Sequence, residues 1–324
     1  MHKMTTKLGL SAAVAAAILS TTTTVQANQL YADIRYSLNS IDTNNVDNLT
    51  FDNNASRFGL KGKYDLGGGN NAFYHIQIGF DPEAADNLTR RFGFIGLGGK
   101  WGKTLFGTIS TQYKLAGFKH DPFYDTAAGL KLGGRNYGLS IRTDGFYDNT
   151  LSYITPTVGG VTGNVMVSID DDAADEHSYN YGVKWGNKKG GVNLQLLDEN
   201  SSTAADRRDA VRLSGHYKTS SFKFYVSLEN IDHETGGDTD YLYANATFNV
   251  SKNTKLAASI GSVDDNNGGD GIGTAGDGFA LGVFHNLHKK TQLYALYSTV
   301  DADTNTSDRD VISLGISQKF SIGE

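Results

Sequence analysis

Apolar and polar residues alternate one by one along most of this 324-residue chain. In the stretch 30–38, Leu30, Ile34 and Leu38 share one side of an extended chain, whereas Asp33 and Arg35 fall on the other. Successive side chains of a β-strand point to opposite faces, so this pattern predicts strands with one apolar and one polar face. The same pattern recurs throughout the chain in segments of about ten residues, most clearly at 57–66, 74–80, 179–185, 211–218 and 222–229.

The connections between these segments differ in length. Short ones cover 67–71, 98–102, 187–191, 220–221 and 287–290, and long ones, rich in Asp, Asn and Gly, cover 39–54, 81–89, 198–209, 264–277 and 300–309. Short turns at one end and long polar loops at the other are typical of barrels of the bacterial outer membrane, and the segments number about 16. We therefore predict an all-β fold, a closed transmembrane antiparallel barrel formed as one domain by residues 28–324.

A soluble β-sandwich is the alternative, because its strands also alternate, with the apolar face inside. Two features of the mature chain favour the membrane barrel. Aromatic residues stand near segment ends, as in an interfacial girdle, for example Tyr36, Tyr64, Phe80 and Tyr217. The polar faces carry several charges per segment, which suits a water-filled lumen.

The first 27 residues have the three regions of a secretory signal peptide. Lys3 and Lys7 are positive, 8–19 is apolar, and 25–27 ends in small residues at Ala27. The apolar run is too short to span about 30 Å of hydrocarbon as a helix. We expect cleavage after Ala27 and export to the outer membrane.

Composition argues against several other functions. Loss of the two leader lysines would change the formal net charge from −6 to −8, which offers no basic surface for nucleic acid. The chain has no cysteine, so a structural zinc site is improbable. The G-x-G-x-x-G match at 271–276 lies in an acidic loop without the strand and helix that nucleotide binding needs. We predict no enzyme activity, no catalytic residues, no cofactor and no metal; the acidic runs 170–172 and 264–267 could hold Ca²⁺ but fit solvated loop tips better.

The alternation fails between Ser110 and Tyr147. A connection this long inside a compact barrel needs a reason, and a loop folded into the lumen supplies one. Acidic loop residues opposite basic wall residues would set a field across a narrow opening and sort ions by sign. The candidates are Asp121 and Asp125 on the loop and Arg35, Arg57, Lys61 and Arg91 on the predicted inner wall. For Lys114 and Asp144, a solvated outer loop is an equally good interpretation.

Four motifs give a resemblance to a known family. Residues 56–62 (SRFGLKG), 91–97 (RFGFIGL), 149–156 (NTLSYITP) and 314–320 (LGISQKF) resemble strands of Gram-negative general diffusion porins, in the same order. The resemblance implies a 16-stranded homotrimer in outer-membrane lipid and lipopolysaccharide, with a third loop in the pore and a second loop, 81–89, that latches onto a neighbouring subunit. It also implies passive diffusion of ions and small hydrophilic solutes.

Carried over by position, the resemblance makes Arg57 and Arg91 wall arginines, Asp121 and Asp125 loop carboxylates, and Arg135 and Arg142 basic residues after the loop. The chain departs from the family at two places. Thr108 stands after Gly107 where an arginine is usual, and four residues follow Phe320, which is usually terminal.

The leading hypothesis is therefore a general diffusion porin. From the net charge and Thr108 we expect a weak preference for cations. A porin selective for a solute such as an oligosaccharide would need an aromatic track along the lumen, for which Phe123, Tyr124, Tyr137, Tyr241 and Tyr243 are candidates. A third alternative is a non-conducting adhesin or structural barrel that acts through its Asp/Asn-rich loops.

Overall fold

A computed structural model describes most of the chain after the leader, namely residues 25–81, 88–132, 135–140, 143–169, 176–200, 207–235, 237–265, 275–303 and 308–323. The first strand, β1 (Val25–Thr43), begins two residues before the expected cleavage site at Ala27, and cleavage there stays a prediction. None of the helices in these ranges is long and apolar enough to cross a membrane.

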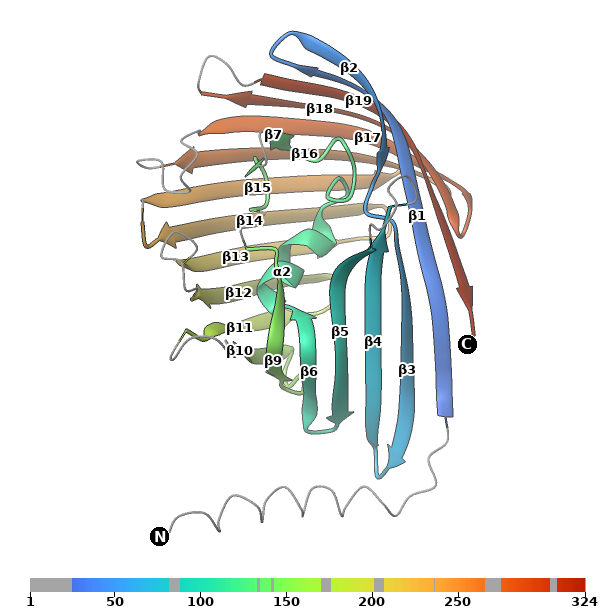
Figure 1. Ribbon diagram of the computed structural model, residues 1–324, viewed down its shortest axis with the longest axis vertical. Helices are drawn as coiled ribbons and strands as arrows, with labels where there is room; N and C mark the ends of the chain where they lie inside the picture. The colour runs from blue at the N-terminus through green and yellow to red at the C-terminus, as the bar shows by residue number, and fades with distance from the viewer. Residues whose placement is uncertain are drawn as a thin grey trace.

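The strands form one large antiparallel sheet that closes on itself (Figure 1). Closure is made by β19 against β1, with Leu38 opposite Leu314 and Leu30 opposite Ile322. Besides β1, the strands of this sheet are β2 (Val46–Asn53), β3 (Arg57–Gly67), β4 (Asn70–Phe80), β5 (Leu88–Gly99), β6 (Gly102–Ser110), β9 (Phe146–Ile154), β10 (Val161–Ser168), β11 (Ser178–Gly186), β12 (Gly190–Glu199), β13 (Arg208–Lys218), β14 (Phe222–His233), β15 (Asp238–Asn249), β16 (Thr254–Asp265), β17 (Gly276–His288), β18 (Thr291–Ala302) and β19 (Asp308–Ile322).

The sheet has 17 assigned strands, but β2 and β3 occupy a single place in the ring. β2 pairs with the second half of β1, and β3 pairs with its first half. Together they make one wall strand that is interrupted at 54–56. The barrel therefore has sixteen wall strands, and the predicted fold class is confirmed.

The two faces of the wall differ as the alternation predicts. Along β17, exposure alternates residue by residue: Phe279 and Leu281 are exposed on the outside, whereas Ala280 and Phe284 are buried inside. Aromatic pairs lie on the outer face near both ends of the barrel. Trp101 stacks on Tyr153 beside a short turn, and Tyr36 stacks on Phe51 toward the long-loop end.

The predicted long loop 39–54 is wrong. β1 continues to Thr43, and the tight turn Asn44–Asn45 leads directly into β2. Both asparagines have a positive φ, 56° and 63°, which is the geometry of a two-residue hairpin turn and one that asparagine tolerates well. The polar residues that suggested a loop are one face of this hairpin.

Two other expectations concern the second loop and the C-terminus. The predicted latching loop, 81–89, lies mostly outside the described residues, which resume at Leu88 with β5. The closing strand continues past Phe320 to Ile322, whose partner is Leu30. Phe320 and Ile322 both lie exposed on the apolar outer face, so the residues after Phe320 extend the strand.

The orientation of the wall can be tested with a matched pair of arginine substitutions. Leu314 is exposed in the middle of the outer face of β19, whereas Gln292 faces the lumen from β18. We expect Leu314→Arg to lower the free energy of unfolding by about 2–4 kcal/mol, because the charge enters lipid, and Gln292→Arg to cost less than about 1 kcal/mol. Denaturant titrations in phospholipid vesicles measure both. Equal costs for the two variants would contradict the assignment of the faces.

Candidate pore constriction

The connection between β6 and β9 lies inside the barrel (Figure 1). It contains α2 (Gln112–Gly117), the 3₁₀ turn η1 (Phe118–His120) and a small hairpin of β7 (Lys131–Leu132) and β8 (Arg135–Asn136). This connection, residues 111–145, is called the inner loop below. Its helix contacts β11, β12 and β13 on the far wall. The break in alternation thus correctly predicts a loop folded into the lumen.

Polar groups of the wall satisfy the backbone of α2. Thr111 caps its N-terminus and accepts a hydrogen bond from the Lys114 amide. The side-chain oxygen of Asn180, on β11, accepts from the amides of Gln112 and Tyr113 at 3.0 and 3.3 Å. At the other end of the helix the Tyr225 hydroxyl donates to the Ala116 carbonyl at 2.9 Å. The free ends of a helix are otherwise unsatisfied in a buried place.

A buried ion pair fixes both ends of the inner loop to the wall. Arg212 on β13 and Glu229 on β14 face each other at 2.6 Å, and their side chains are only 2% and 1% exposed. Glu229 also accepts hydrogen bonds from the hydroxyls of Tyr113 and Thr143, at 2.9 and 2.8 Å. Arg212 donates to the Tyr113 carbonyl at 2.9 Å, and its guanidinium lies 4.5 Å from the centre of the Tyr113 ring. The start and the end of the loop are therefore attached to one pair.

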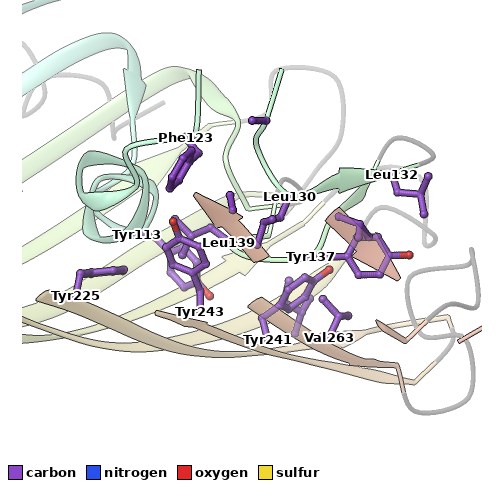
Figure 2. Close-up of a cluster of buried hydrophobic side chains, with 14 of the residues drawn as sticks. Tyr113, Phe123, Leu130, Leu132, Tyr137, Leu139, Tyr225, Tyr241, Tyr243 and Val263 are labelled. Carbon is purple, nitrogen blue, oxygen red and sulfur yellow. The ribbon is translucent and has the colours of Figure 1, made fainter. Parts of the chain in front are cut away.

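Apolar packing holds the rest of the loop against β14–β16. Figure 2 shows loop side chains that include Tyr113, Leu130 and Leu139 lying over Tyr225, Tyr241, Tyr243 and Val263. Phe123, Tyr137, Tyr241 and Tyr243 belong to this buried cluster, and each is at most 6% exposed. They do not form the open track that a sugar-selective pore would need. Tyr124 is half-buried at the edge of the lumen and donates a hydrogen bond to Asp144.

The tip of the inner loop meets the opposite wall through Asp125. One oxygen of this carboxylate accepts hydrogen bonds from Arg35 at 2.7 Å and from Arg57 at 2.5 Å. Arg35 also pairs with Asp33 at 2.5 Å. Burial opposes the charge of Asp125, but the guanidinium groups of Arg57 and Arg35 hold the pKa of its carboxyl below the usual range. Asp125 is thus neutralised by direct contact and does not face the wall arginines across an open gap.

Three other predicted site residues lie either on the wall or within the inner loop. Arg91 and Lys61 face the lumen: Arg91 donates to Gln77 at 2.7 Å, and the Lys61 ammonium lies 5.6 Å from the Tyr31 ring centre. Asp121 accepts a hydrogen bond from the Phe123 amide within the loop, and burial raises the pKa of its carboxyl.

The last two predicted site residues are Arg135 and Arg142. Arg135 lies in β8, but its side chain is outside the described part of the structure, and so is the whole of Arg142. Thr108, which stands where the family usually has an arginine, lies at an irregular part of the wall. Gly107 and Ile109 flank a register shift, and Thr108 donates a hydrogen bond to Asp148, which also pairs with the exposed Arg90.

Sequence reasoning missed a set of lysines around the short-turn half of the lumen. Strand register places them on the inner face, and Lys119 of the inner loop lies near two of them. Within the described residues none of these lysines forms an ion pair. The sequence does contain a signal for these lysines, because each lysine stands at a polar position of the alternation close to a short turn. They are Lys63, Lys103, Lys184, Lys218, Lys223, Lys255 and Lys319, in addition to Lys61, which the sequence analysis predicted.

Lys114 is also part of the lumen wall. Its ammonium donates to the Asp144 carbonyl and lies 3.9 Å from the centre of the Phe146 ring. Burial lowers the pKa of this lysine. The solvated outer position considered for Lys114 and Asp144 is therefore wrong.

These groups surround a cavity of about 650 Å³ beside the inner loop. Arg35, Arg57, Arg91, Lys114 and Lys255 line it, together with Asp121 and Asp125. A second hollow of about 590 Å³, nearer the short turns, contains Lys61 and Lys63. His75, Phe94, Lys103 and Leu105 line both hollows, so the two adjoin.

A sixteen-stranded closed sheet with an apolar outside, a charged inside and one inward loop defines the class of outer-membrane channels. The sequence model of the Gram-negative porin family matches residues 6–305. The chain therefore belongs to the Gram-negative porins and is an outer-membrane channel protein.

Individual relatives agree with this family. Outer membrane porin protein 32 of Delftia acidovorans is 27% identical over 273 residues, which cover 77% of this chain and 76% of the relative. Among solved structures, the anion-selective porin from Comamonas acidovorans has a TM-score of 0.76 at 20% identity and covers 92% of this chain and 100% of its own. The Salmonella typhi OmpF complex with daunomycin has a TM-score of 0.72 at 14% identity, covering 92% and 97%.

The buried pair can be tested by removing one partner. Glu229→Ala leaves Arg212 buried without a counter-charge, a change that typically costs about 3–5 kcal/mol. We expect a lower unfolding free energy and noisy single-channel current, because both ends of the inner loop lose an attachment. Asp148→Asn, which breaks the exposed pair with Arg90, is the matched control and should cost at most about 1 kcal/mol. A quiet, unchanged channel in Glu229→Ala would show that the pair does not hold the loop.

The lowered pKa of Asp125 gives a pH prediction. A carboxyl with a depressed pKa in the folded state stabilises that state above its unfolded pKa, and the contribution is lost as pH falls through the folded value. The Asp125 contact should therefore survive the pH range around 3.9 in which free aspartate titrates and fail only below it. Conductance traces recorded from pH 7 downward should change below that range. Asp125→Asn should show its altered conductance at every pH, and a transition above pH 5 in the unmodified protein would contradict the assignment.

Proposed function

We propose that this porin is a passive diffusion channel for ions and small hydrophilic solutes, and that it prefers anions. One observation carries the preference: Asp125 at the constriction is paired with two arginines, whereas most cations of the lumen form no ion pair within the described residues. Fixed charges of one sign along a pore raise the local concentration of the opposite ion.

The charge at the constriction can be followed group by group. Asp33 and Asp125 share the two arginines Arg35 and Arg57. Arg91 then adds a positive charge, because in the described part of the chain it bonds the neutral Gln77 and forms no ion pair. Lys114 adds another beside the Phe146 ring. Even with Asp121 counted as negative, the cavity beside the inner loop is lined by more positive than negative groups.

This proposal replaces the cation preference expected from the overall charge. Many acidic residues stand in or next to the long connections, including the run at 170–172 and the end of β16 at 264–265. The lumen near the short turns instead carries the set of inward-facing lysines described above. Exposed charges separated by more than about 8–10 Å are largely screened at physiological salt, so a passing ion responds to the lysines near it. The anion selectivity stated for the Comamonas acidovorans porin agrees with this proposal.

We further propose that the channel assembles as a homotrimer in a bilayer of outer-membrane lipid and lipopolysaccharide. A trimer form is stated for a solved neighbour, OmpT of Vibrio cholerae, with a TM-score of 0.68 at 16% identity. The second loop, at 81–89, stays the candidate for subunit contact.

The two alternatives have less support. An oligosaccharide-selective pore loses its candidate aromatics, since four of them pack between the inner loop and the wall. A non-conducting barrel is disfavoured by the two adjoining hollows beside the inner loop.

Reversal potentials in planar bilayers test the selectivity. In a tenfold KCl gradient we expect the reversal potential to be shifted from zero toward the equilibrium potential of chloride. We also expect conductance steps in groups of three. Lys103→Glu combined with Lys255→Glu should move the potential toward the potassium value, because both lysines line the cavity. Lys252→Glu, in the exposed turn between β15 and β16, is the control and should leave the potential unchanged.

Two results would contradict the proposal. A potassium-selective reversal potential in the unmodified channel would refute the anion preference and leave the channel itself in place. The absence of any conductance from refolded protein would refute the diffusion channel and favour the structural barrel.

A further inference from the structure

A row of aromatic side chains lies on the lumen face of β4, β5 and the start of β9. Phe73, His75, Phe92, Phe94 and Phe146 face inward by strand register and are all half-buried. We call them the aromatic wall; Phe94 packs against the edge of the buried cluster, and none of the five rings is among the fully buried members of that cluster. His75, Phe92, Phe94 and Phe146 line the cavity at the constriction, and Phe73 lines the second hollow nearer the short turns.

The rings of the aromatic wall contact one another in sequence. Phe73 meets Phe94 edge to face at 6.4 Å, Phe94 is stacked on Phe92 at 5.9 Å, and Phe92 lies 6.0 Å from Phe146. His75 meets Phe92 edge to face at 4.8 Å. The rings thus extend without interruption from the short-turn side of the lumen to the inner loop.

Glycines leave room for this wall on the lumen side. Gly96 lies directly beneath the Phe73 ring, where a Cβ would come within 2.4 Å of the ring atoms. Gly107 of β6 has a φ of 128°, which disfavours a side chain at this position next to Phe94. A side chain at Gly96 would displace the Phe73 ring, and one at Gly107 would meet the backbone of Gly93 and Phe94.

Cations lie along both ends of the aromatic wall. The guanidinium of Arg91 and the ammonium of Lys114 lie 5.3 and 3.9 Å from the centre of the Phe146 ring. At the other end, Lys103 lines both hollows beside Phe94, and Lys61 and Lys63 line the second hollow, nearer the short turns. Within the described residues, none of these five cations forms an ion pair.

We propose that the aromatic wall and its cations form a binding track for planar aromatic anions, such as aromatic carboxylates. A solute ring can lie against Phe92 or Phe94, and its carboxylate can meet Arg91 at the constriction and Lys103 on the short-turn side of it. Ring faces attract flat apolar groups, and guanidinium groups bind carboxylates in a matching plane.

The chemistry of the track favours this class over sugars. A sugar site needs acceptors as well as donors for its hydroxyls, but the charged residues beside the rings are all donors. The carboxylates that line the same cavity are Asp125, which two arginines occupy, and Asp121, which bonds its own loop. A neutral aromatic solute would use the rings and leave the cations solvated.

This inference rests on the proposed anion-conducting function and specifies the solute class. Single-channel recordings at pH 7 with added benzoate, and with cyclohexanecarboxylate of equal charge and similar size, test it. We expect benzoate to block the chloride current at a concentration about three- to tenfold lower than cyclohexanecarboxylate. Benzamide, which has the ring without the charge, should block more weakly than benzoate.

Two matched substitutions locate the effect. Phe94→Leu keeps apolar bulk in the lumen but removes a central ring, and should bring benzoate and cyclohexanecarboxylate to within about twofold of each other. Phe106→Leu removes a ring that is 44% exposed on the outer face of the neighbouring strand β6 and should preserve the difference. An unchanged denaturant unfolding midpoint in both variants would show that both barrels are intact.

The outcomes separate this inference from the proposed function. Anion selectivity in KCl with equal block by the two carboxylates would overturn the aromatic track alone. Block of the current by a neutral sugar at a lower concentration than benzoate requires would also overturn it, in favour of a sugar site. Potassium selectivity in KCl would refute the proposed function, and the comparison of benzamide with cyclohexanecarboxamide would then decide whether the rings bind aromatic solutes at all.

Discussion

The backbone of a strand in lipid has no water to bond with, and this constraint shapes the whole molecule. Each unsatisfied amide or carbonyl in hydrocarbon costs several kcal/mol, so a sheet can span a membrane only when it closes. The pairing of β19 with β1, from Leu30 opposite Ile322 to Thr43 opposite Arg309, removes the two edges that would otherwise remain. Once the ring is closed, alternation assigns every second side chain to lipid and the others to the interior.

A ring of this size has more interior than wall side chains can fill, since barrels of 16 to 18 strands leave an aqueous channel. The inner loop divides that space. Its buried apolar residues pack against β14–β16, and the Arg212–Glu229 pair attaches both its ends to the same wall. On the opposite side, Asp125 contacts Arg35 and Arg57. The loop thus fills one side of the lumen and leaves the open path along the aromatic wall of β4 and β5.

The strands were predictable because their signal is local. Period two in the sequence shows directly which residues share a face, and the length of each break indicates a turn or a loop. The hairpin at Asn44–Asn45 was missed because 39–54 is rich in Asp, Asn and Thr, so that composition suggested a loop. The interior of the inner loop was beyond prediction for another reason: Tyr113, Arg212 and Glu229 are far apart in sequence, and only the closed barrel brings them together.

The charge of the pore shows the same difference between local and distant information. The net charge of −6 is a property of the whole chain, but an ion in the lumen interacts mainly with groups within about 10 Å. Whether a charged residue is one of these groups depends on whether it points inward in the alternation and on how close it lies to a short turn. Lys103, Lys255 and Lys319 satisfy both conditions, whereas the acidic runs of the long connections satisfy neither. The position of each charge in the strand register is therefore a better guide to selectivity than the sum of charges.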